Sequence, residues 1–193
     1  MTEVYIHDET FNNNDFTDKS LAKGEYEHCV FSNCNFNNCI LSGFQFIDCD
    51  FIGCNLSLAR LDKTAFRDIK FKDCKMLGLR FETCNEFGLA FSFENCNLNH
   101  ASFFKTKIKK TVFINTQLHE TDFAECDLTG ALFERCDLAR AQFERTNIEN
   151  ADLRTSYNYS INPELNRVKK AKFSVSGLPG LLEKYDIYID NQS

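Results

Sequence analysis

Residues 121–153 read TDFAECDLTGALFERCDLARAQFERTNIENADL, and every fifth residue from Phe123 to Leu153 is large and apolar. Two positions before each of these centres stands a small residue, which is alanine, threonine or cysteine. A period of five fits neither the 3.6-residue turn of an α-helix nor the two-residue alternation of a simple strand. The chain must therefore turn a corner every five residues.

The same period covers most of the chain. Fifteen consecutive centres are apolar from Phe11 to Phe81, and after a slip of two residues thirteen more run from Phe93 to Leu153. Phenylalanine also recurs at a spacing of twenty, which indicates that four units close one square coil and that stacked coils bury a continuous core. The sequence predicts an all-β protein, a right-handed quadrilateral parallel β-helix of about seven coils.

Two segments are expected, a β-helix over residues 1–175 and a cap over residues 176–193. The register slip at 82–92 predicts a bulge or kink there, which either shapes a binding surface or only accommodates an insertion. In the cap, Gly177–Tyr185 is interpreted as a short helix and Asp186–Ile189 as a strand. The ends of a β-helix are edge-like, so apolar cap residues predict a two-fold homodimer. The predicted dimerisation residues are Leu178, Leu181, Leu182, Tyr185, Ile187 and Ile189.

Composition points to a cytoplasmic protein. The first ten residues lack the apolar core of a signal peptide, and no stretch approaches the ~18 apolar residues of a membrane span, so no membrane contact is expected. All ten cysteines fall on small inward positions, which predicts reduced core thiols. There is no CxxC pair and no histidine in register with a cysteine column, so no metal and no cofactor is expected.

The sequence contains no nucleophile elbow, Walker loop, HExxH motif or dinucleotide fingerprint. One enzymatic alternative rests on His100 and His119, whose outward positions on adjacent coils suggest a catalytic histidine of the kind found in β-helical acyltransferases. Those enzymes use a hexapeptide repeat and an extended loop that this chain lacks. We therefore expect no catalytic residues, and a protein that is not an enzyme.

Units such as Cys126–Gly130 (CDLTG) and Ala151–Thr155 (ADLRT) resemble the pentapeptide-repeat family. Within that family, CKMLG at 74–78, SFENCNL at 92–98 and LLEKYDI at 181–187 are similar to the bacterial topoisomerase-protecting branch, which includes the Qnr quinolone-resistance proteins and the albicidin- and microcin-immunity proteins. The resemblance implies a dimeric rod that mimics duplex DNA, binds DNA gyrase or topoisomerase IV, and makes no direct contact with nucleic acid.

The distribution of charge bears on this resemblance. Spread over the whole rod, the net charge of −6 is far sparser than that of DNA. Residues 116–160 alone carry nine acids and four bases over a predicted ~11 Å, which approaches the one charge per ~1.7 Å of duplex DNA. The predicted partner-binding acids are Asp122, Glu125, Asp127, Glu134, Asp137, Glu144, Glu149 and Asp152.

The middle of the chain has the opposite charge. Residues 58–115 carry six acids and eleven bases, and four lysines crowd together at Lys105, Lys107, Lys109 and Lys110. This basic band departs from the uniformly acidic surface of a DNA mimic. It supports an alternative function, in which the β-helix is a scaffold that binds an unrelated protein partner.

Overall fold

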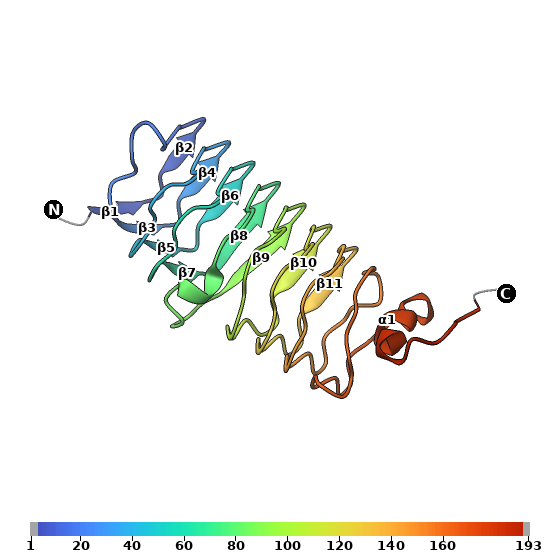
Figure 1. The fold of residues 1–193 in the computed structure, drawn as a ribbon. Helices are drawn as coiled ribbons and strands as arrows, with labels where there is room; N and C mark the ends of the chain where they lie inside the picture. The colour runs from blue at the N-terminus through green and yellow to red at the C-terminus, as the bar shows by residue number, and fades with distance from the viewer. Residues whose placement is uncertain (1–3, 191–193) are drawn as a thin grey trace.

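The computed structural model describes residues 4–190 and shows an elongated rod, a four-sided parallel β-solenoid of about seven turns with a short helix at the C-terminal end (Figure 1). The predicted fold class is therefore confirmed. Each strand pairs in parallel with a strand twenty or twenty-two residues before or after it in the chain. None of the helices formed by residues 4–190 is long and apolar enough to cross a membrane.

Two of the four sides carry regular strands, which we call the long sheet and the short sheet. The seven-stranded long sheet runs along most of the rod as far as β11, and the short sheet of four strands covers the N-terminal half. The long sheet consists of β2 (Thr10–Asn12), β4 (Val30–Ser32), β6 (Asp50–Ile52), β8 (Ile69–Lys72), β9 (Phe91–Glu94), β10 (Val112–Ile114) and β11 (Leu132–Glu134). The short sheet consists of β1 (Val4–His7), β3 (Gly24–Glu27), β5 (Gln45–Ile47) and β7 (Ala65–Arg67).

The other two sides are held by bridges between single residues. One, the asparagine side, is a column that includes the bridges Asn35–Asn55 and Asn97–Gln117. The other, the Ser102 side, includes the bridge between Ser102 and Asp122. Beyond β7 the short-sheet side continues in the same way, through bridges such as Lys107–Asp127.

Stacked phenylalanine rings fill the core. Phe113 stacks on Phe133 with centroids 4.8 Å apart, and Phe103 stacks on Phe123 at 5.3 Å. Rings from opposite sides meet edge to face, as Phe113 and Phe123 do at 6.1 Å. Both geometries are favourable for aromatic pairs, so the sequence repeats phenylalanine at a spacing of twenty because each ring packs on its own kind in the next coil.

The small inward positions also form hydrogen bonds. Cys54 Sγ donates to the Phe31 carbonyl at 3.2 Å, and Thr64 Oγ1 donates to the Leu41 carbonyl at 2.8 Å. These positions therefore suit residues that are small and carry a donor. Eight of the ten cysteines are buried, which confirms that they point inward, while Cys39 and Cys84 are half-buried.

The register slip lies in the loop formed by residues 84–90, which follows the short 3-10 helix η1 (Phe81–Thr83). The long sheet passes this point undisturbed, since Phe71 pairs with Phe93. The short sheet ends at β7. The two extra residues are thus absorbed as a bulge on one side of the rod.

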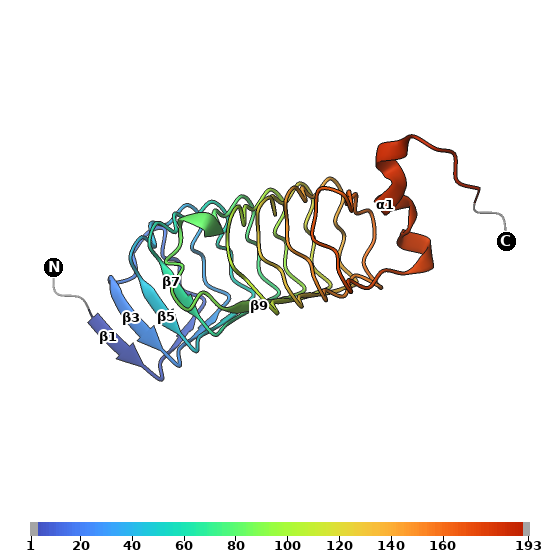
Figure 2. The ribbon, with the colours of Figure 1, turned by 90° about the horizontal axis from the view of Figure 1, so that it is seen from below.

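The C-terminal cap lies across the last coil (Figure 2). It contains the 3-10 helix η2 (Val175–Gly177), the α-helix α1 (Pro179–Leu182) and the 3-10 helix η3 (Glu183–Tyr185). The short helix was predicted. The strand expected at Asp186–Ile189 is wrong, because Asp186 turns the chain with φ 49° and residues 187–189 pair with no strand in the described part of the chain. Residues 1–3 and 191–193, which belong to the two predicted segments, lie outside the described residues.

Replacing Phe123 by alanine should lower the free energy of unfolding by about 3–5 kcal/mol, because the rings stacked above and below Phe123 prevent the cavity from collapsing. Urea unfolding of the purified protein measures this loss. Phe87→Ala is the matched control, since Phe87 is 77% exposed and its removal leaves no cavity. Equal losses in the two variants would contradict the buried column.

Candidate interaction surfaces

The two histidines of the enzymatic alternative do not form a joint site. His100 Nδ1 lies 3.2 Å from Glu120 Oε2, whereas His119 Nε2 lies 2.8 Å from Asp137 Oδ2. Each ring thus has its own carboxylate on the outer surface of the rod. No group of three or more histidine, cysteine, aspartate or glutamate residues within 4–190 is arranged to hold a metal ion.

The eight predicted acids form a belt around the rod, which we call the acidic belt. Register places Glu134 and Asp152 on the long-sheet side and Asp137 on the asparagine side. Asp127 lies on the short-sheet side, where it bridges to Asn147, and Asp122 lies on the Ser102 side, where it bridges to Ser102. The structure therefore distributes these carboxylates over all four sides instead of gathering them on one.

The aspartates of the acidic belt have a structural role. Asp122 Oδ1 accepts the amide of Ala124 at 2.8 Å, and Asp137 Oδ1 accepts the amide of Ala139 at 3.2 Å. Asp127 and Asp152 make the same bond two residues ahead. Such local bonds stabilise the turn at each corner. The glutamates make no such bond within the described residues, so their carboxylates do not stabilise the turns of the backbone.

Basic residues neutralise much of the acidic belt. Glu125 contacts Lys105 of the preceding coil at 3.6 Å and Arg145 of the following coil at 2.9 Å. Comparable ion pairs join Asp127 to Lys109, Glu149 to Arg167, Asp152 to Arg154, and Glu134 to Arg135. Among the residues that the structure describes, only Asp122 and Glu144 of the eight acids have neither a basic residue nor a histidine as an ion-pair partner.

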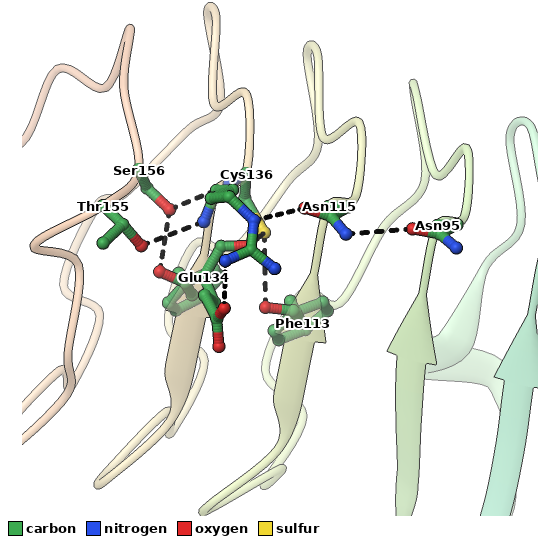
Figure 3. A network of polar contacts seen from close by, with 9 residues as sticks. Asn95, Phe113, Asn115, Glu134, Cys136, Thr155 and Ser156 are labelled. Carbon is green, nitrogen blue, oxygen red and sulfur yellow. Dashed lines mark hydrogen bonds and ion pairs between the residues drawn. The ribbon is translucent and has the colours of Figure 1, made fainter.

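The surroundings of Glu134 show how these cations are held (Figure 3). Arg135 contacts Glu134 and also donates from Nε to Asn115 Oδ1 at 2.7 Å, while Asn115 donates to Asn95 Oδ1 at 3.0 Å. The Arg135 amide in turn donates to Thr155 Oγ1 at 3.0 Å. Residues one coil apart thus form a polar ladder along this corner, and the ladder fixes the charge beside Glu134.

Hydrogen bonds and nearby cations hold the pKa of three of these aspartates below its ordinary value. Burial of the Asp127 carboxyl by itself raises the pKa, but bonds from Thr129 and from the Lys109 ammonium outweigh it. For Asp152 the largest cause of the lowered pKa is the bond from the Arg154 guanidinium. A carboxylate with a lowered pKa stabilises the fold above about pH 4, and this contribution disappears as the pH falls through the folded-state pKa.

Replacing Asp127 by asparagine should therefore cost stability at pH 7 but less at about pH 3, because the contribution of a lowered pKa is progressively lost once the pH falls below the ordinary carboxyl value of about 4. Asparagine keeps the acceptor for Thr129 but loses the charge beside Lys109. Urea unfolding at the two pH values measures the difference. Asp68→Asn, at an exposed position, should show a smaller change. A cost for Asp127→Asn that is the same at both pH values would exclude this role.

The structure divides the predicted dimerisation residues into two groups. Leu178, Tyr185 and Ile187 are about half exposed, at 45%, 54% and 55%. Leu181 packs against the core, while Leu182 and Ile189 line a pocket of about 660 Å³ beside Tyr159. Sequence analysis missed two further exposed apolar residues at this end, Val175 and Tyr188, although both follow the last repeat and have no place in its period.

Sequence analysis also missed Phe87, which lies in the loop at the register slip. The Arg67 guanidinium lies 5.8 Å from the centre of the Phe87 ring, in cation–π geometry. Phe87 falls on no centre of the repeat, and this is the one signal in the sequence that marks it as a surface aromatic.

Two models of one family match the sequence, one described as pentapeptide repeats (8 copies) over residues 29–68 and 49–85, and the other as a pentapeptide repeat region over residues 89–153. The chain belongs to the pentapeptide-repeat family, whose members are generally non-enzymatic scaffolds. No curated protein matches the sequence significantly.

Solved structures with a similar fold include two trypsin-treated forms of QnrB1, described as a plasmid-mediated fluoroquinolone resistance protein. One is 18% identical with a TM-score of 0.62, covering 98% of this chain and 100% of QnrB1. The other is 19% identical with a TM-score of 0.63, covering 97% and 98%. HetL, a pentapeptide repeat protein of the cyanobacterium Nostoc, is 16% identical with a TM-score of 0.49, covering 88% of this chain and 72% of HetL. At these identities the likeness establishes the fold alone.

Proposed function

We propose that this protein is a non-enzymatic DNA mimic that binds DNA gyrase or topoisomerase IV and protects the enzyme from a topoisomerase poison. The observation that carries the proposal is the acidic belt, in which carboxylates face outward on all four sides of a rod. Duplex DNA likewise presents phosphates around its whole circumference. The basic DNA-binding surface of a topoisomerase would meet negative charge whichever side of the rod it faced.

The ion pairs within the belt restrict the proposal. They leave Asp122 and Glu144 as its least compensated acids, and these two lie on neighbouring coils. The surface ion pairs are exposed and therefore weak. Arginine and lysine residues of a partner can accordingly compete for the same carboxylates. The resemblance of the fold to QnrB1, a fluoroquinolone resistance protein, supports a topoisomerase as the partner.

The proposal also includes a homodimer. The acidic belt adjoins the cap, where Leu178, Tyr185 and Ile187 are exposed. A two-fold axis through the cap would bring two belts together at the centre of a longer rod. Exposed apolar residues at the end of a solenoid are typical of a protein interface.

The gyrase prediction is tested best with amide substitutions, which remove charge but keep side-chain shape and the acceptor of the turn bonds. We expect neutralisation of four belt acids to weaken binding to purified gyrase by about tenfold or more and to make affinity less dependent on salt. Binding is measured by surface plasmon resonance at two salt concentrations. The four substitutions are Asp122→Asn, Glu134→Gln, Glu144→Gln and Glu149→Gln.

A matched control removes the same number of charges from the other half of the rod. It should change affinity by less than about twofold under the proposed mode of binding. If both variants bind as the wild type does, or if the wild type does not bind gyrase, the proposal is wrong. The control substitutions are Glu9→Gln, Glu25→Gln, Asp48→Asn and Asp68→Asn.

The dimer is tested by placing charges in the exposed part of the cap. Leu178→Asp with Ile187→Asp should convert the dimer to a 22.3 kDa monomer in light scattering, because burying unpaired carboxylates in an apolar interface is unfavourable. Ile40→Asp with Leu58→Asp is the matched control, at residues 63% and 56% exposed near the other end. A wild type that is itself a monomer would refute the interface.

A further inference from the structure

The loop at the register slip leaves one edge of the solenoid unpaired. It is bound to the coil before it, through the Asn85 amide to the Thr64 carbonyl at 2.9 Å and the Ala90 amide to the Phe66 carbonyl at 3.0 Å. Within residues 4–190, no backbone hydrogen bond joins residues 84–90 to residues 105–110 of the following coil.

Lys107 is the residue most affected by this gap. On its other edge it pairs normally with the next coil, through the bridge to Asp127 and the bond from the Ile108 amide to the Asp127 carbonyl at 3.0 Å. On the loop side, the part of the chain that the structure describes offers no backbone partner to the Lys107 amide or carbonyl. Unpaired strand edges of this kind accept an added strand.

A pocket of about 500 Å³ occupies this gap, and we call it the break slot. Cys84 and residues 86–89 of the loop form one wall and residues 104–107 form the other. Buried Phe81 and half-buried Leu89 supply apolar lining, and Phe87 stands at the rim with 77% of its surface exposed. The break slot therefore combines an unpaired backbone edge with an apolar interior.

The charges around the break slot differ between its walls. Lys107 lines the break slot, and Lys110, three residues further along the chain, lines the neighbouring pocket beside Phe91. Neither forms an ion pair with a carboxylate among the described residues, although Lys105 and Lys109 pair with Glu125 and Asp127. The loop wall instead carries Glu86, and Glu82 of η1 also lines the break slot but pairs with Arg80 at 2.8 Å. An occupant with carboxylates is thus attracted to the Lys107 wall. The groups that it presents to the loop wall must be uncharged or basic.

We propose that the break slot binds an extended acidic segment of a partner protein, which adds as a strand to the free edge of Lys107. Alternate residues of a strand point to opposite faces. One set of side chains, small and aliphatic, would enter the slot between Phe87 and Phe81. The other set, acidic, would contact Lys107 and Lys110.

Single-stranded nucleic acid is the competing occupant, because lysines beside an exposed aromatic ring suit phosphates and stacked bases. Two observations favour the peptide. Glu86, which forms no ion pair among the described residues, repels phosphates at the loop wall, and the unpaired edge of Lys107 is satisfied by the amide and carbonyl groups of a peptide strand. The break slot adjoins the acidic belt, since Lys105 of its wall pairs with Glu125, but the slot and the belt share no residue, so the two proposals are tested with different substitutions.

The proposal is tested with a fluorescein-labelled hexapeptide of alternating valine and glutamate, whose binding is followed by fluorescence anisotropy. Lys107→Glu with Lys110→Glu should weaken binding by about tenfold or more. Lys169→Glu with Lys170→Glu is the matched control, because it makes the same change in charge at exposed lysines near the C-terminal end and should leave affinity within about twofold. Equal weakening in both variants would show nonspecific attraction and overturn the proposal.

Two further arms separate strand addition from other modes of binding. A hexapeptide with proline in place of the central valine lacks one backbone donor and should bind about tenfold more weakly. Phe87→Ala should weaken binding of the valine peptide without lowering the stability of the protein, since the Phe87 side chain is exposed. Equal affinity for the proline peptide, tighter binding of a labelled oligo-dT, or no binding of the valine peptide to the wild type would each overturn the proposal.

Discussion

The hydrogen-bond ladder between coils is the constraint on which the rest of the structure depends. It fixes each residue above its equivalent in the next coil, as in the bond from the Lys110 amide to the Thr129 carbonyl at 2.9 Å. Since every side chain has a fixed neighbour in the next coil, rings stack on rings and small residues on small residues. The same rule applies outside, where like charges directly above one another would repel. The column Lys105, Glu125, Arg145 avoids this by alternating sign.

This alternation explains why the net charge of a segment is a poor guide to the surface that a partner meets. Residues 116–160 keep their excess of acids, but their arginines lie beside carboxylates of the same or a neighbouring coil. Further cations come from outside the segment, such as Lys109 and Arg167. The roles of the belt acids also differ from residue to residue, since the aspartates bond to backbone amides and the glutamates do not. Substitutions at glutamates therefore probe charge with the least disturbance of the turns.

The coil architecture was predictable because a period of five leaves no other regular arrangement, and the columns of phenylalanine followed from the spacing of twenty. The ion pairs of the acidic belt were in principle accessible in the same way, since Glu125 lies twenty residues from both Lys105 and Arg145. Counting charge by segment missed them. The free edge at Lys107 was not predictable, because it depends on which carbonyls the loop residues reach. The strand expected at Asp186–Ile189 failed for a similar reason, since apolar residues alone do not provide a partner strand.

The bulge at the register slip also shows how such a rod can acquire new parts. Two additional residues enter one side, while Phe71 still stacks on Phe93 at 5.4 Å on another. The remaining sides keep their register from one coil to the next past the insertion. A solenoid of this kind can therefore gain or lose a surface loop in one evolutionary step without refolding the coils on either side. Related rods can therefore vary at one corner while the other sides keep their register, and such variation is a route by which they come to bind different partners.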